Sequence, residues 1–268
     1  GCKNVAIGAA AMDALTTGKW NVGLGANALG ASTTGCNNIG IGEAALGLTD
    51  TTGNCNIAIG TCTGIIGASD GNVLIGSGIF CVNGAAAGEF NIGIGSQLFN
   101  YANHADVDYN IGIGWCQYDS TSQQASGHHN IAMGFKSLQL ISSGVHNVAI
   151  GQNALHGSST SSYNVAIGLQ AMGVGVTTGD HNIAFGYAAM DALTSGTCNI
   201  AIGENSLGAS TTGSYNVAIG NAALGVGVTT GDQNIAIGTN AADALTTGKW
   251  NIAIGENSLG ASTTGCLN

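Results

Sequence analysis

Cysteine, histidine and acidic residues are the side chains of this 268-residue chain best suited to metal binding or nucleophilic chemistry. The eight cysteines contain no Cys-x-x-Cys pair, so the spacing of a structural zinc site is missing. His128 and His129 are adjacent, and we expect them to point apart on a strand. Asp106 and Asp108 can share a face but have no further ligands nearby in sequence. No group of residues resembles a nucleophile with its base. We therefore predict no catalytic residue, no metal site and no cofactor.

A five-residue motif recurs along the whole chain: Asn, Val or Ile, a small residue, an apolar residue and Gly. It begins at Asn4, Asn21, Asn38, Asn56, Asn72, Asn91, Asn110, Asn130, Asn147, Asn164, Asn182, Asn199, Asn216, Asn234 and Asn251. The period is about 17 residues, which is too short for a helical repeat. No linker interrupts it, so we predict one domain over 1–268, with an irregular middle at about 61–146 where the spacing drifts.

Alternation of β-branched residues within the motif predicts a short strand, and the Gly predicts a bend. A second apolar residue follows eight positions after the Asn, as at Leu46, and many units then end in Thr-Thr-Gly. We predict an all-β fold, a parallel β-solenoid (β-roll or β-helix) of about fifteen coils.

The two large residues of each strand are expected to fill the interior. The third motif position, Ala or Gly in 14 of the 15 units, is then expected to face outward. So small an outer face predicts close packing against a copy of the chain, most simply as a homotrimer. Lateral packing in a bundle and a free monomer are the alternatives.

The asparagine column is predicted to be structural, because fifteen copies of one catalytic residue serve no purpose. An Asn at a coil corner can bond both to backbone and to the Asn of the next coil. The predicted ladder includes Asn4, Asn21, Asn38, Asn56, Asn147, Asn164, Asn216 and Asn251.

The composition excludes several classes of protein. Lys and Arg together number 4 against 14 Asp and Glu, which argues against a nucleic-acid partner. The apolar share of 44% argues against disorder. Polar residues and glycine interrupt every apolar stretch, so we predict no membrane span.

The motif Asn-Val-Ala-Ile-Gly, followed by an apolar residue and Thr-Thr-Gly, resembles the repeat tracts of bacteriophage tail-fibre proteins. Its Val-Ala-Ile-Gly core also resembles the head repeats of trimeric autotransporter adhesins, which form a parallel β-roll packed as a trimer. The resemblance implies a non-catalytic structural protein that forms a rigid extracellular fibre or shaft on a virion or cell surface. The partner it implies is the chain itself.

Other features leave alternatives open. Gly1-Cys2-Lys3-Asn4 and Gly265-Cys266-Leu267-Asn268 share a phase of the repeat, so we expect either head-to-tail stacking into a filament or a longer array. Cys36 and Cys55 fall on adjacent coils and are a candidate disulfide, or else merely small corner residues.

A surface-binding module is the rival function. Aromatic residues of the irregular region can form a patch for a cell-surface glycan, or can simply fill wider coils; the candidates are Tyr101, Tyr109, Trp115 and Tyr118. An ice-binding β-solenoid is the other version, although adjacent threonines at a corner should point in different directions.

Overall fold

The computed structural model describes residues 1–268 except 65–66, 82–87, 100–106, 118–125, 175–176 and 228. The described part is all-β and contains no helix. It falls into two compact units, residues 1–132 and 133–268, which are described separately. The repeat continues through both units.

Each copy of the motif forms one strand, which starts at the residue after the Asn. The strands are β1 (Val5–Ile7), β2 (Val22–Leu24), β3 (Ile39–Ile41), β4 (Ile57–Ile59), β5 (Val73–Ser77), β6 (Ile92–Ser96), β7 (Ile111–Trp115), β8 (Ile131–Met133), β9 (Val148–Ile150), β10 (Val165–Ile167), β11 (Ile183–Phe185), β12 (Ile200–Ile202), β13 (Val217–Ile219), β14 (Ile235–Ile237) and β15 (Ile252–Ile254).

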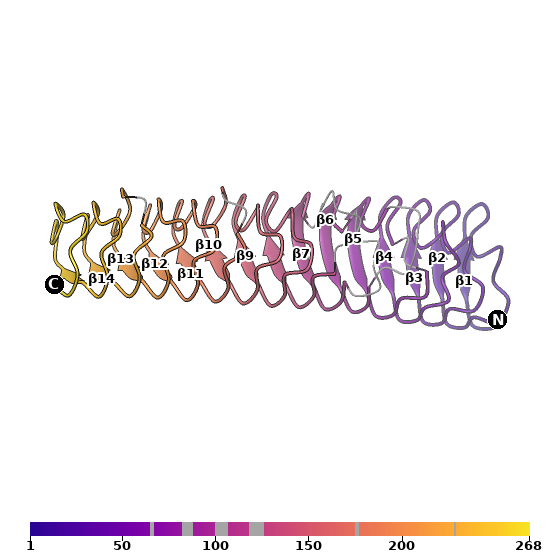
Figure 1. The fold of residues 1–268 in the computed structure, drawn as a ribbon. Coiled ribbons are helices and arrows are strands. Elements are labelled where there is room, and N and C mark those ends of the chain that lie inside the picture. Colours follow the sequence, from indigo (N-terminus) through magenta and orange to yellow (C-terminus); the bar gives the residue numbers. More distant parts are fainter. Residues whose placement is uncertain (65–66, 82–87, 100–106, 118–125, 175–176, 228) are drawn as a thin grey trace. The chain divides into compact units, whose positions relative to one another are not determined.

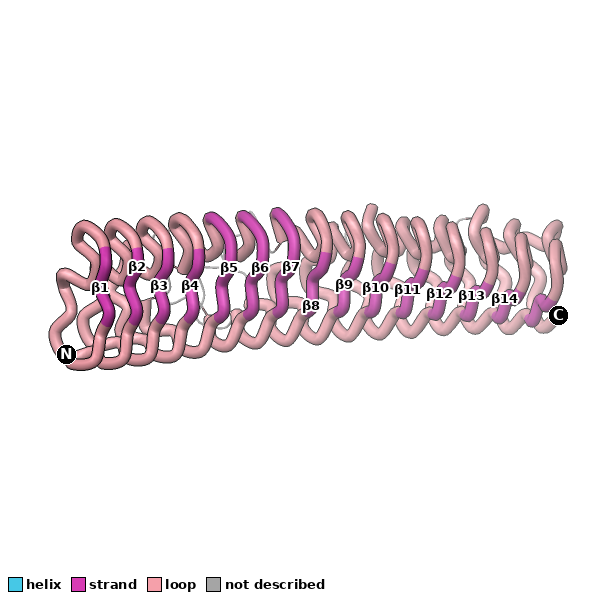
Figure 2. Tube along the Cα trace, turned by 180° about the vertical axis from the view of Figure 1, so that it is seen from behind, coloured by secondary structure: helices cyan, strands magenta, loops and turns pink. Residues whose placement is uncertain are grey.

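Within each unit, consecutive strands pair in parallel and in chain order (Figures 1 and 2). The register aligns equivalent motif positions, so that Val165 lies beside Ile183 and Ala166 beside Ala184. Every motif position therefore becomes a column that runs from coil to coil. The predicted parallel β-solenoid with a period near 17 residues is confirmed.

The prediction of which strand residues face inward was wrong. The second residue, Ala or Gly in all but one strand, is buried in every strand from β2 to β15, whereas the large apolar residues on either side of it are half-buried or exposed. In β12, for example, Ala201 is 0% exposed while Ile202 is 40% exposed. The interior is thus lined by small strand residues, and the large ones lie outside.

The physical reason is that the interior of a coil is narrow and another residue fills it. The apolar residue eight positions after the Asn enters from the opposite side, and Leu155, Leu207 and Leu224 are all 0% exposed. A Cβ added at Gly40 would lie 3.3 Å from Cγ of Leu29, so the strand has room for little more than a hydrogen or a methyl group.

The one exception to the small middle residue shows the same limit on interior volume. Leu74 takes the place of Ala or Gly in β5 and is fully buried. Position eight of the preceding coil, which normally carries the large residue, is Gly64. A Cβ added there would lie 2.8 Å from Leu46 and 3.4 Å from Leu74. Where the strand carries a large side chain, the position that faces it therefore carries a glycine in place of the usual large residue.

The coils that begin at Asn72, Asn91 and Asn110 accommodate their extra residues by lengthening the strand. β5, β6 and β7 have five residues instead of three and pair over their whole length. Much of the predicted irregular region, about 61–146, thus keeps the column register, and four of the six undescribed segments also fall within it.

The glycine that ends the motif allows neighbouring coils to approach closely. Gly168 has φ +136° and Gly203 has φ +129°, and a Cβ on Gly168 would lie 2.3 Å from the carbonyl oxygen of Gly186 in the next coil. No other residue fits this bend without displacing backbone.

The inverted packing predicts opposite effects for two neighbouring positions. Ala201→Leu should destabilise the protein by about 1–3 kcal/mol, since it adds volume to a filled interior. Ile202→Val, on the exposed side, should change stability by less than about 0.5 kcal/mol. Urea unfolding followed by circular dichroism measures both. If Ala201→Leu were tolerated and Ile202→Val were damaging, the result would instead support the orientation predicted from sequence, in which the large strand residues face inward.

Candidate functional site

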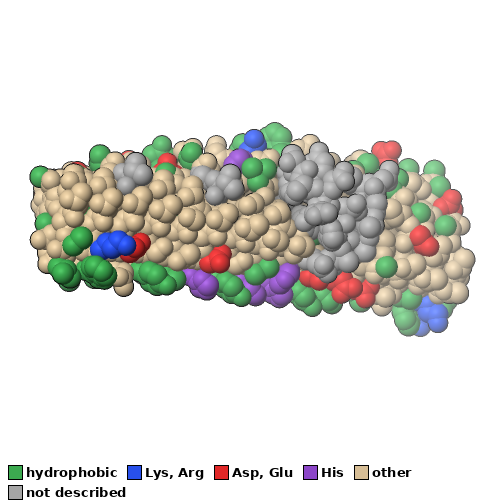
Figure 3. Space-filling model, in the orientation of Figure 1, with side chains coloured by type: hydrophobic (Ala, Val, Ile, Leu, Met, Phe, Trp, Pro, Cys, Tyr) green, Lys and Arg blue, Asp and Glu red, His purple; other side chains and the backbone are tan. Residues whose placement is uncertain are grey.

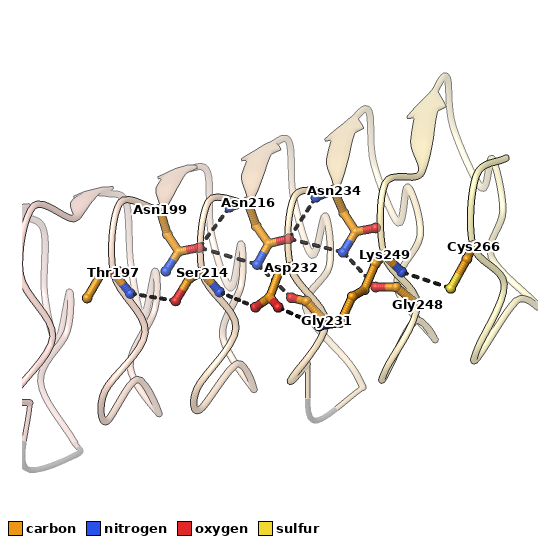
Figure 4. Close-up of polar contacts among 10 residues, drawn as sticks. All are labelled: Thr197, Asn199, Ser214, Asn216, Gly231, Asp232, Asn234, Gly248, Lys249 and Cys266. Carbon is orange, nitrogen blue, oxygen red and sulfur yellow. Dashed lines mark hydrogen bonds and ion pairs between the residues drawn. The ribbon is translucent and has the colours of Figure 1, made fainter.

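The motif asparagines form a buried hydrogen-bonded ladder, as predicted. The backbone N–H of Asn216 donates to Oδ1 of Asn199 at 2.9 Å, and Oδ1 of Asn216 accepts from the backbone N–H of Asn234 at 2.9 Å. Nδ2 of Asn216 donates to the carbonyl of Gly231 in the next corner at 2.9 Å (Figure 4). Each side chain thus connects a strand start to a neighbouring corner.

The same bonds recur at the other predicted ladder positions. Asn21 donates to Oδ1 of Asn4 at 2.8 Å, and Asn38 donates to Oδ1 of Asn21 at 2.8 Å. The remaining members make equivalent contacts: Asn56 to Asn38, Asn164 to Asn147, and Asn251 to Asn234. From Asn21 to Asn251 the column is no more than 1% exposed, so these amides bind the coils together and are not presented to a ligand.

A second ladder is formed by residues two positions before the motif Asn. It could not be predicted from the sequence, because the residue type at this position varies from coil to coil. The backbone N–H of Thr197 donates to Oγ of Ser214, and that of Ser214 donates to Oδ1 of Asp232, both at 3.1 Å (Figure 4). Here the side chain belongs to the later coil, whereas in the asparagine ladder it belongs to the earlier one. Any short side chain with an acceptor can serve, so Ser, Asp and Asn interchange.

Lys249 and Asp232 form an ion pair, with Nζ 2.7 Å from Oδ2. The hydrogen bond from Lys249 is the main cause that lowers the pKa of Asp232. Since both side chains are partly exposed, the pair makes a modest, screened contribution to stability.

The residue directly before each Asn adopts a left-handed backbone and projects from the corner. His146, Tyr163 and His181 stack with ring centroids 5.1 and 4.9 Å apart, and Tyr109 stacks between Phe90 and His129 at 5.3 and 4.8 Å. Their φ values lie between 55° and 61°. Figure 3 shows histidines gathered along this edge among hydrophobic side chains. Stacking offsets part of the cost of the unusual backbone.

The predicted glycan-binding residues are not brought together in the described structure. Tyr101 and Tyr118 lie outside the described residues. Tyr109 stands at the corner before β7, whereas Trp115 ends that strand and donates from Nε1 to Oε1 of Gln97 at 2.9 Å. The two are separated by the length of the strand, about 17–20 Å. Both ring faces of Tyr109 are covered by its neighbours in the stack.

The predicted disulfide is not formed, because neither Cys36 nor Cys55 is joined to another cysteine. Cys36 lies two residues before its Asn and Cys55 only one, so they belong to different columns. The backbone N–H of Cys55 donates to the carbonyl of Cys36 at 3.0 Å, while Sγ of Cys36 contacts the carbonyl of Thr34. The contact between the residues is through backbone, not sulfur.

A different cysteine pair is in contact. The thiols of Cys62 and Cys81 are hydrogen-bonded, and burial, followed by the proximity of Cys62, raises the pKa of Cys81. A raised pKa keeps the thiol protonated, which is the opposite of what a cysteine nucleophile needs. Sequence spacing gave no signal for this pair.

His128 and His129 do not point apart, contrary to expectation. Their Nδ1 atoms lie 2.8 Å apart because His129 has φ 58° and does not belong to a strand. Asp106 lies outside the described residues, and Oδ1 of Asp108 accepts the backbone N–H of Glu89. In the part of the chain that the structure describes, no three His, Cys, Asp or Glu residues are grouped to hold a metal ion.

The largest unexplained feature is the outer strand face, by which we mean the first and third residues of each strand. Its members in residues 1–132 include Val5, Ile7, Leu24, Ile75, Ile92 and Ile94, all 38–59% exposed. In residues 133–268 it includes Ile183, Phe185, Ile202, Ile219, Ile235, Ile237, Ile252 and Ile254, which are 36–67% exposed. None of the strands in the described part of the chain contains a charged residue.

Removal of one asparagine side chain from the ladder should lower the free energy of unfolding. Asn216→Ala leaves the backbone N–H of Asn234 and the carbonyl of Gly231 without partners, at about 1–3 kcal/mol for each buried group. We expect unfolding at a clearly lower urea concentration. Asn221→Ala is the matched control: its Nδ2 makes only an exposed contact of 3.4 Å with Glu204, so its effect should stay within about 0.5 kcal/mol. Equal effects of the two changes would contradict the ladder's structural role.

The lowered pKa of Asp232 predicts an acid-dependent stability. A carboxyl whose pKa is depressed on folding stabilises the protein above its unfolded pKa and loses that contribution as the pH falls through the folded pKa. Asp232→Asn should therefore lower the melting temperature slightly at neutral pH, and the difference should vanish in acid. Thermal unfolding at a series of pH values measures this. In a Lys249→Met background the pH-dependent difference should shrink; if it persists unchanged, Lys249 is not its cause.

No helix among the described residues is long and apolar enough to cross a membrane. Comparison with known proteins found no match: no family model, no curated protein and no solved structure is similar to the chain. The function must therefore be inferred from the two ladders, from the outer strand face and from the corner column, by which we mean the residue directly before each motif Asn.

Proposed function

We propose that the chain is a non-catalytic structural protein, a stiff solenoid segment of an extracellular fibre or shaft. The observation that carries the proposal is the buried asparagine ladder. It bonds each coil to the next through side chains that are no more than 1% exposed from Asn21 to Asn251. A fold that uses its most regularly repeated polar side chain for internal bonding is suited to bearing load and not to recognising a small substrate.

The extracellular location is part of the same proposal. It rests on the resemblance of the Asn-Val-Ala-Ile-Gly repeat to bacteriophage tail-fibre tracts and adhesin heads. Only 7% of residues are charged, so much of the surface is free of charged side chains that would have to lose water in an assembly. The partner we propose is the chain itself, as a homotrimer or as a head-to-tail filament.

A surface-binding role is the second candidate, and the exposed corner column is the feature that favours it. Two observations weigh against particular versions. The stacked faces of Tyr109 leave only ring edges for a sugar. Thr51 is buried while Thr52 is exposed, so adjacent threonines do not form the paired rows on one flat face that an ice-binding surface needs.

Immunogold electron microscopy tests the structural proposal. Antibodies raised against the purified chain should label fibres or projections on the outside of the virions or cells that carry it. Pre-immune serum from the same animals is the control. Label confined to the cell interior would contradict the proposed location. Label spread over the cell surface without fibres would contradict the proposed shaft and favour a surface-binding module.

A further inference from the structure

Cys62 and Cys81 bring two thiols together at a place that neither ladder uses. They belong to neighbouring coils, which begin at Asn56 and Asn72. Their thiols are hydrogen-bonded to each other, and both side chains are half-buried, so a small reagent can still reach them from solvent. Two thiols held in contact across coils can be joined covalently, whereas a single cysteine cannot do this within one chain.

The backbone holds Cys62 against the next coil. Cys62 stands six residues after its Asn, and the equivalent residue of the next coil is Gly78; both have a left-handed backbone, with φ values of 50° and 64°. The N–H of Gly78 donates to the carbonyl of Thr61 at 3.2 Å, and the N–H of Gly64 donates to that of Ile79 at 2.9 Å. Cys62 is therefore fixed between two hydrogen bonds to the segment that leads into Cys81.

The glycine at position 78 makes room for the second sulfur. Other coils carry a side chain here, as at Asn27, Ala44 and Gln97, and only a hydrogen stands at Gly78. A Cβ added to Gly78 would lie 4.0 Å from the Cβ of Cys81. The side chain of Cys81 therefore lies beside the space that a larger residue would occupy, and from there its thiol reaches Cys62.

We propose that Cys62 and Cys81 are an oxidisable pair that forms a disulfide bond between neighbouring coils, with a small-molecule disulfide such as oxidised glutathione as the oxidant. Neighbouring coils lie about 4.8 Å apart, within the Cα separation of about 4.4–6.8 Å that disulfides span. The bond would fasten the two coils in which Leu74 and Gly64 exchange the usual places of large and small residues. This inference goes beyond the proposed fibre and does not depend on it.

The reaction is a thiol–disulfide exchange in two steps. The thiolate of one cysteine attacks a sulfur of the small disulfide, whose sulfur–sulfur bond breaks and releases one glutathione thiolate. The thiolate of the other cysteine then attacks the protein sulfur of the mixed disulfide and releases the second glutathione. The two protein thiols lose two protons and two electrons, and the oxidant gains them. Burial raises the pKa of Cys81 and so reduces its thiolate fraction, and we expect the exchange to take hours.

Disulfide mapping of the folded chain tests the proposal. The reduced protein is freed of reductant and incubated with oxidised and reduced glutathione at neutral pH, and its remaining thiols are then blocked with iodoacetamide. The single-chain band of a non-reducing gel is cleaved before each Asp and analysed by mass spectrometry. The cleavage separates the relevant cysteines: residues 13–49 contain Cys36, residues 50–69 contain Cys55 and Cys62, and residues 70–105 contain Cys81.

We expect fragments 50–69 and 70–105 to be joined, and to separate again on reduction. Cys62→Ala should abolish this link; Ala44 occupies the same position of another coil with φ 55°, so the backbone accepts the change. Cys55→Ala is the matched control, because Cys55 lies on the same fragment, and it should retain the link. Fragment 13–49 should stay unlinked to 50–69, since Sγ of Cys36 is directed at the carbonyl of Thr34.

Three results would overturn the proposal: no joined fragments in the folded, unaltered chain, a link that persists in folded Cys62→Ala, or a link that forms only when the chain is unfolded in urea. Circular dichroism establishes that each protein is folded. If Cys62→Ala does not fold, Cys62→Ser replaces it with the same expectation. None of these results bears on the fibre, which immunogold labelling tests separately, so the failure of one proposal can be distinguished from the failure of the other.

Discussion

The structure depends on one constraint: where the residue eight positions after the Asn enters the interior, the facing strand has no room for a second large side chain. A period of about 17 residues leaves a narrow cross-section, and the residue eight positions after the Asn occupies it. The strand must therefore contribute Ala or Gly, and Leu74 is admitted only where Gly64 stands opposite. The Val and Ile residues that promote strand formation are left on the outside. Local strand preference and interior volume together thus produce an apolar outer surface.

Side-chain hydrogen bonds satisfy the backbone polar groups that become buried when coils with such small cores stack on one another. Each coil has many corners, and the backbone groups at the corners are buried by the neighbouring coils. The asparagine ladder satisfies one set, with each side chain accepting from the next coil. The ladder through Ser214 and Asp232 satisfies another set in the opposite direction. These side chains substitute for the long-range packing that a larger globular domain would have, so stability is distributed along the chain and is sensitive at every coil.

The sequence was sufficient to predict the period, the strands, the glycine bends and the asparagine ladder, because each leaves a column of one residue type. The side of the strand that faces inward could not be deduced from alternation, which defines two faces but does not say which is buried. The pairing of Leu74 with Gly64 was the available clue, since only residues that share the interior compensate in volume. Contacts such as that between His128 and His129 depend on left-handed corner residues, which strand geometry does not anticipate. Tyr101 and Tyr118 lie outside the described residues, so that part of the glycan prediction stays a prediction.

Register in columns also has a genetic consequence. Residues 199–213 and 251–265 are identical in sequence, and they occupy equivalent places in their coils. Unequal recombination between the corresponding DNA segments would delete or duplicate whole coils, and every ladder would rejoin in phase. The number of coils can therefore vary between related genes while the side chains that each coil presents on its surface stay the same. Length becomes a trait that selection can adjust in steps of whole repeats, three for this pair of segments, without a new fold at each step.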